Sequence, residues 1–152
     1  MWTSNKSINL SLVLCAMLIL AIILAGILAP FYLEEFFGFF NGNMQENSTK
    51  SIVFMSCFYP SAFLGVVALF SLMKMLNRIK REDPVCRSNV KSLKVISLCF
   101  FVVALITFIG CFFYKPFMFI AAAAGFLGLI LRVVKNVIQT AVELREESDL
   151  TV

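Results

Sequence analysis

Four stretches of this chain are apolar over a length that can cross a lipid bilayer. The first is a charge-free run from Ile8 to Ala29, which as a helix rises about 33 Å, against a hydrocarbon core of about 30 Å. The whole chain is 61% hydrophobic and only 14% charged, whereas soluble proteins average about 45–50% and about 25%. Because 152 residues could not cover so much apolar surface in water, the sequence predicts a membrane protein.

The four stretches predict a single all-α domain over residues 1–152, a polytopic bundle of four transmembrane helices. We expect the helices at about residues 8–29, 52–76, 90–113 and 117–144. Pro30 is expected to end the first helix, and Ser88 or Asn89 to cap the third. Pro60 lies inside the second helix, where it removes a backbone donor and predicts a kink. The kink either serves packing or lines a cavity.

A basic hinge, residues 72–94, separates the second and third spans, and residues 77–89 are its predicted loop. It holds seven of the thirteen basic residues: Lys74, Arg78, Lys80, Arg81, Arg87, Lys91 and Lys94. Loops rich in Lys and Arg stay in the cytoplasm. The hinge and both termini therefore share the cytoplasmic side of a plasma membrane, and only Lys50 and Lys115 lie outside. No aromatic residues interleave the hinge cations, so we expect lipid headgroups, and not nucleic acid, as their ligands.

One face of the fourth helix changes from small to charged residues. Its small half, with Ala121, Ala124, Gly125 and Gly128, lets another helix backbone approach closely, so we expect helix packing and self-association there. Arg132 and Lys135 continue the same face. They either reach lipid phosphates at the inner rim or bind an acidic group in a crevice open to the cytoplasm.

The last residues, 135–152, predict an amphipathic cytoplasmic tail with one Val/Ile/Leu face. Its end is acidic, through Glu143, Glu146, Glu147 and Asp149. An anionic membrane surface would repel these carboxylates, which favours a protein contact.

Residues that carry catalysis are missing from the sequence. It has no histidine, no CxxC pair and no GxSxG, HExxH or P-loop motif, so we expect no enzyme, cofactor or metal site. Four of the five cysteines lie in apolar segments, where cysteine packs as a small hydrophobe. Cys57 and Cys111 lie towards the same outer side, and the sequence leaves open whether they pair.

Two segments carry a family resemblance: PVCRSNVKSLKVIS, residues 84–97, and AVELREESDLTV, residues 141–152. Together with the four-helix layout they resemble a bacterial membrane family catalogued as domain of unknown function 2975. The matching residues are Pro84, Asn89, Lys91, Leu93, Lys94, Glu143, Leu144, Glu146, Glu147, Asp149, Leu150 and Thr151. Val85 stands where the family has Phe, and Arg87-Ser88 replaces an acidic residue. The resemblance implies no known reaction. Family members are often encoded beside a helix-turn-helix regulator, which implies a cytoplasmic DNA-binding partner.

Three functions remain open. The first is a non-enzymatic sensor or anchor whose cytoplasmic face, formed by the hinge and the tail, holds a soluble regulator. The second is a small transport or self-protection protein that handles an amphiphile or peptide near Pro60. The third is a structural subunit of a larger complex.

Overall fold

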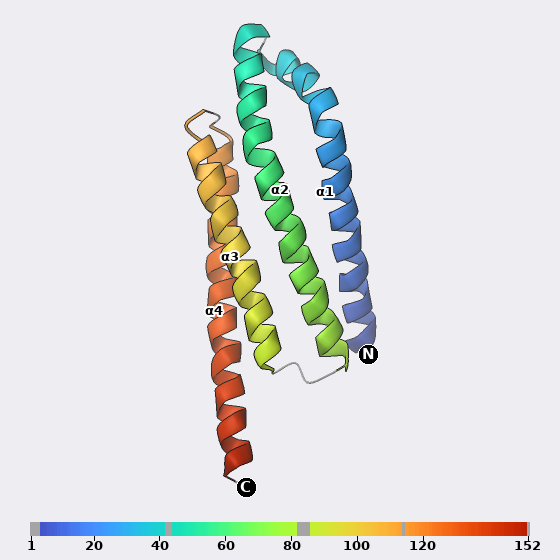
Figure 1. Cartoon of the computed structure of the whole chain (residues 1–152), viewed down its shortest axis with the longest axis vertical. Helices are drawn as coiled ribbons and strands as arrows, with labels where there is room; N and C mark the ends of the chain where they lie inside the picture. Colours follow the sequence, from blue (N-terminus) through green and yellow to red (C-terminus); the bar gives the residue numbers. More distant parts are fainter. Residues whose placement is uncertain (1–3, 42–43, 82–85, 114, 152) are drawn as a thin grey trace.

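Four long helices make up the regular structure of the described residues. A computed structural model of the chain describes residues 4–41, 44–81, 86–113 and 115–151, with side chains from residue 7 to 32 and, within those ranges, from residue 50 onward. The helices are α1 (Ser4–Asn41), α2 (Met44–Arg81), α3 (Arg87–Gly110) and α4 (Phe117–Leu150). Each contains a stretch that is long and apolar enough to cross a membrane. The predicted all-α, four-span fold is confirmed, and the chain is a multi-pass membrane protein (Figure 1).

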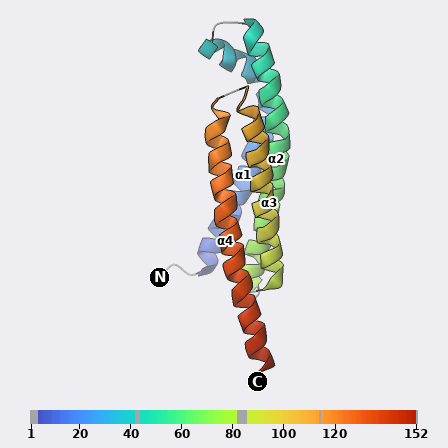
Figure 2. The same cartoon turned by 90° about the vertical axis from the view of Figure 1, so that its left-hand side faces the viewer.

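The helices pack in the order of the chain. The backbones of α1 and α2, of α2 and α3, and of α3 and α4 approach each other closely, and α2 also meets α4 through the stacked rings of Phe54 and Phe117. The start of α1, the end of α2, the start of α3 and the end of α4 lie at one end of the molecule (Figures 1 and 2). We call this the basic end and the opposite one the turn end. Burial is concentrated in the apolar windows of α3 (33%) and α4 (22%), against 6% for α1 and for α2, so α1 and α2 present most of their surface to lipid.

Pro30 does not end the first helix, contrary to the prediction. α1 continues through it to Asn41. A proline has no N–H for the carbonyl of the residue four positions earlier, which is Gly26. The hydroxyl of Tyr59 on α2 donates to that carbonyl oxygen, at 3.2 Å. The hydrogen bond lost to Pro30 is therefore replaced from the neighbouring helix, and α1 can continue.

Most of the predicted loop 77–89 is helical. α2 extends to Arg81, with Arg78, Lys80 and Arg81 in its last turn, where cations interact favourably with the negative end of the helix dipole. α3 begins at Arg87, one residue after the extended Cys86. Ser88 and Asn89 thus lie in the first turn and do not cap the helix, and Asn89 is almost fully buried. Residues 82–85 of the hinge, including Pro84, lie outside the described part.

The small face of α4 packs against α3 of the same chain. Ala121, Ala124 and Gly128 are buried, and a Cβ added at Gly128 would lie 3.5 Å from atoms of Phe100 and Phe101. The backbones come close enough for the Ser97 hydroxyl to donate to the carbonyl oxygen of Gly128, at 2.9 Å. Because α3 already covers this face, association of two chains would have to use another surface.

At the turn end, Gly110, the last residue of α3, packs closely against residues of α2 and α4. Phe117, only 4% exposed, stacks on Phe54 with ring centroids 5.5 Å apart, and both Phe117 and Cys57 lie against Gly110. Cys57 and Cys111 are free thiols.

The basic end as candidate functional site

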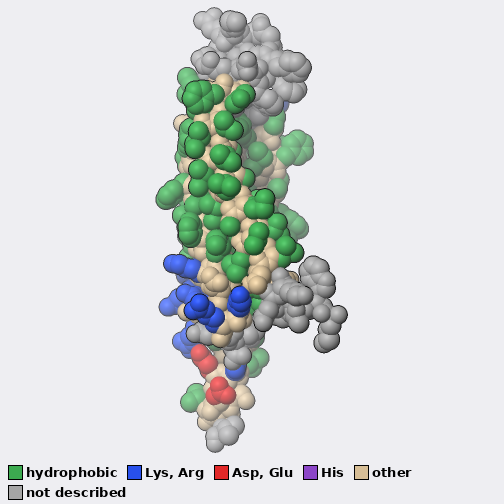
Figure 3. Space-filling model, turned by 90° about the vertical axis from the view of Figure 1, so that its right-hand side faces the viewer, with side chains coloured by type: hydrophobic (Ala, Val, Ile, Leu, Met, Phe, Trp, Pro, Cys, Tyr) green, Lys and Arg blue, Asp and Glu red, His purple; other side chains and the backbone are tan. Residues whose placement is uncertain are grey.

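Nine predicted cations gather at the basic end. They lie on the last turns of α2, the first turns of α3 and the middle of α4: Lys74, Arg78, Lys80, Arg81, Arg87, Lys91, Lys94, Arg132 and Lys135. We call them the basic belt. Figure 3 shows Lys and Arg side chains at the edge of the apolar band, with carboxylates following further along the molecule. The apolar band marks the part that lipid covers, so the belt lies where the membrane meets water.

Some belt residues join neighbouring helices. The ammonium of Lys80 on α2 donates to Oδ1 of Asn9 on α1, at 2.8 Å. A guanidinium N–H of Arg78 on α2 donates to the carbonyl oxygen of Ser88 on α3, at 3.2 Å. Hydrogen bonds of the belt thus join α2 to α1 and to α3 at the basic end.

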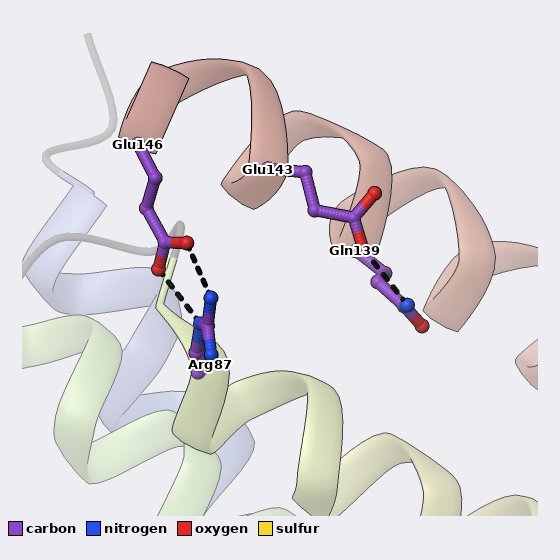
Figure 4. A network of polar contacts seen from close by, with 4 residues as sticks. All are labelled: Arg87, Gln139, Glu143 and Glu146. Carbon is purple, nitrogen blue, oxygen red and sulfur yellow. Dashed lines mark hydrogen bonds and ion pairs between the residues drawn. The ribbon is translucent and has the colours of Figure 1, made fainter. Parts of the chain in front are cut away.

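Arg87 and Glu146 join α3 to α4 through a two-pronged ion pair. The Nε and NH2 groups of Arg87 donate to the two carboxylate oxygens of Glu146, at 2.7 and 2.6 Å. One turn earlier on α4, Gln139 donates to Glu143, at 3.0 Å. Figure 4 shows that Arg87 and Glu146 face each other between the two helices, whereas Gln139 and Glu143 meet along α4. The hydrogen bond from Arg87, followed by its charge, lowers the pKa of Glu146 below the ordinary 4.5.

The α4 extension, residues 136–150, continues beyond the start of α3 (Figures 1 and 2). One of its faces packs on α3 through Val142, which is 5% exposed, and through Glu146. On the other face lies an exposed apolar stripe, which begins at Val133 just before the extension and continues through Val137, Ala141 and Leu144. Val137 and Leu144 are 64% and 61% exposed. The extension is thus fixed on one face and open on the other.

Two cavities lie between α3 and α4 at the basic end. The first, of about 280 Å³, is lined by Arg87, Val90, Lys91, Gln139, Val142 and Glu143. The second, of about 200 Å³, lies closer to the apolar band and is lined by Lys94, Ser97, Leu98, Phe101, Arg132 and Lys135. The structure therefore brings Arg132 and Lys135 together with a hinge cation, in one cavity that faces away from Lys74 and the end of α2.

Other predicted features lie elsewhere. Pro60 is exposed within the continuous α2 helix, and it lines neither of the two cavities described above. Within the described residues, no group of three His, Cys, Asp or Glu side chains could hold a metal ion. The side chains of Glu34 and Glu35 lie outside the described part.

Sequence reasoning missed the partners of several residues. Glu146 was predicted only as part of an acidic tail, although the structure pairs it with Arg87. Asn89 was predicted as a cap, yet it is 1% exposed. The spacing of Asn89, Leu93 and Ile96 by four and three residues, which places them on one helix face, is the signal that would have indicated its burial.

Comparison with known proteins gives one match. The family described as "Protein of unknown function (DUF2975)" matches residues 3–152. Neither the curated proteins nor the solved structures contain a match to this chain. Since the match covers nearly every residue, from the first turn of α1 through the α4 extension, the chain belongs to the DUF2975 family of proteins of unknown function.

Proposed function

We propose that this protein is a non-enzymatic membrane anchor and sensor that holds a soluble regulatory protein on the cytoplasmic side. One observation supports it most: the α4 extension leaves the bundle as a fixed helix with an exposed apolar stripe. An amphipathic helix that presents apolar residues at positions i, i+4 and i+7 is a common ligand for a hydrophobic groove. The partner thus binds a helix that the membrane domain already holds in place.

The ion pair between Arg87 and Glu146 supports this role. It fixes one face of the extension on α3, so binding does not have to order a free tail. A ligand that is already in its bound conformation binds more tightly, because less conformational entropy is lost. A change in the packing of α3 and α4 within the membrane would also shift the extension, which gives the anchor a way to act as a sensor.

The charges of the extension define the partner. Glu147 is exposed beside the stripe, so the complementary surface is an apolar groove with a basic rim. A DNA-binding regulator of the helix-turn-helix type, the partner that the family relationship implies, is commonly basic. The basic belt favours the cytoplasm for this end of the molecule, where such a regulator works.

The test compares two double variants of the full-length protein in nanodiscs. Val137→Asp with Leu144→Asp puts charges into the stripe, while Asn136→Asp with Thr140→Asp adds the same charges to exposed positions of the same helix. A purified regulator of the helix-turn-helix type, the partner class that the family resemblance implies, is added. We expect it to bind the wild type and the control pair, and to bind the stripe pair at least tenfold more weakly. Absence of binding to the wild type, or equal loss in both pairs, would contradict the proposal.

A further inference from the structure

We propose that the cavity between Lys94, Arg132 and Lys135 binds the phosphodiester of an anionic phospholipid. Lys94 comes from α3, and Arg132 and Lys135 come from consecutive turns of α4, so three cations converge on a space of about 200 Å³. None of the three has an acidic partner among the described residues. The carboxylates of Glu143 and Glu146, about two to three turns beyond Lys135 on α4, bond to Gln139 and Arg87.

The chemistry of the cavity favours a phosphate group. A guanidinium offers two parallel N–H donors to two phosphate oxygens, and lysine ammonium groups add point charges. Ser97 already donates its hydroxyl to the carbonyl oxygen of Gly128, so the cations supply the contacts to the anion. A carboxylate can accept the same two hydrogen bonds from the guanidinium, so the apolar residues in the lining, Leu98 and Phe101, decide in favour of a phospholipid phosphodiester.

The remaining walls are apolar and indicate that the anion is part of a lipid. Leu98 and Phe101 lie one and two turns from Lys94 along α3 in the direction of the membrane, and Leu98 is 62% exposed. From Lys94 to Phe101 the helix rises about 10 Å. Over that distance the lining changes from charged to apolar, which matches the change from headgroup to acyl chain. Figure 3 shows basic side chains directly beside the apolar band.

This site differs from a general attraction between cations and the membrane surface. Lys74 and Arg81, on α2, are equally exposed but do not line the cavity. Neutralising them should weaken general attraction as much as neutralising two cavity residues does. The inference does not depend on a protein partner, because the exposed apolar stripe lies on the opposite face of α4.

The experiment measures lipid retention by native mass spectrometry on the full-length protein in detergent, with phosphatidylglycerol or phosphatidylcholine added. We expect one phosphatidylglycerol per chain, and about a tenfold or greater loss of its affinity in Arg132→Gln with Lys135→Gln. The charge-matched pair Lys74→Gln with Arg81→Gln should keep wild-type affinity. Lys94→Gln, on α3, should also weaken phosphatidylglycerol binding. Thermal melts verify that each variant is folded.

Three results would overturn the proposal. Equal affinity for phosphatidylcholine would show that charge does not select the ligand. Equal losses in the two double variants would reduce the site to general surface attraction. Displacement of the lipid by an equal concentration of inorganic phosphate would identify a free-anion site, since the apolar walls would then contribute nothing.

Discussion

Replacing Gly110 by Ala tests how closely the turn end is packed. A Cβ at this position would lie 2.7 Å from Cδ2 of Phe117 and 2.9 Å from Sγ of Cys57, closer than real Cβ atoms come to such neighbours. Phe117 is buried and stacked on Phe54, so its ring cannot turn away without breaking that contact. Overpacking of this kind costs about 1–3 kcal/mol. An alanine in a helix regains roughly 0.5–1 kcal/mol relative to glycine, which leaves a net destabilisation of about 1–2 kcal/mol.

Gly26→Ala is the matched control, because a Cβ at Gly26 meets nothing within 4 Å. Only the gain in helix propensity remains there, so this variant should be slightly more stable than wild type. Thermal melts with a thiol-reactive dye report unfolding through Cys15 and Cys99, which are 4% and 7% exposed. At about 2–4 °C per kcal/mol for a chain of this size, Gly110→Ala should melt a few degrees below wild type. A melting temperature equal to that of Gly26→Ala would refute the packing described for the turn end.

Three further outcomes follow from single contacts. Tyr59→Phe should destabilise the protein by about 0.6–1.7 kcal/mol, since it removes the hydrogen-bond donor to the Gly26 carbonyl. In the Pro30→Ala background the backbone N–H of residue 30 can bond to that carbonyl, so Tyr59→Phe should cost little stability there. Equal costs in the two backgrounds would contradict the replacement of the lost hydrogen bond by Tyr59. Ser97→Ala should lower the free energy of unfolding by a similar amount, because it removes the buried hydrogen bond from α3 to the Gly128 carbonyl of α4. An unchanged melting temperature would argue against this hydrogen bond. The ion pair with Arg87 lowers the pKa of the Glu146 carboxylate, so its contribution to holding the α4 extension on α3 is present above pH 4.5 and is lost as the pH falls below that value. Spin-label distances between α3 and the α4 extension should therefore lengthen at low pH. A constant distance would count against the ion pair.

The fold followed from the sequence because lipid leaves few alternatives. With no water to bond the backbone, each apolar stretch has to form a helix, and the grouping of Lys and Arg marks the basic end. The belt cations were predictable for the same reason: a charge is costly inside the bilayer and comes to lie at its edge. Length and charge alone therefore indicate the four helices and the belt.

Contacts between helices depend on information that spacing within one helix does not carry. Pro30 indicated a helix end, and only the position of Tyr59 on another helix shows how its lost hydrogen bond is replaced. The small face of α4 indicated close packing, but not that α3 of the same chain would fill it. Likewise, the pairing of Arg87 with Glu146 joins residues 59 positions apart.

The orientation of the basic end tests the proposed function most directly, since a soluble cytoplasmic partner can reach the α4 extension only from the cytoplasmic side. In a cysteine-free background, single cysteines at Arg81 and Lys115, both exposed, are treated with a membrane-impermeant maleimide in intact cells. We predict that Lys115→Cys is labelled in intact cells and that Arg81→Cys is labelled only after the membrane is permeabilised. Labelling of Arg81→Cys in intact cells would place the basic belt outside and contradict the proposed function.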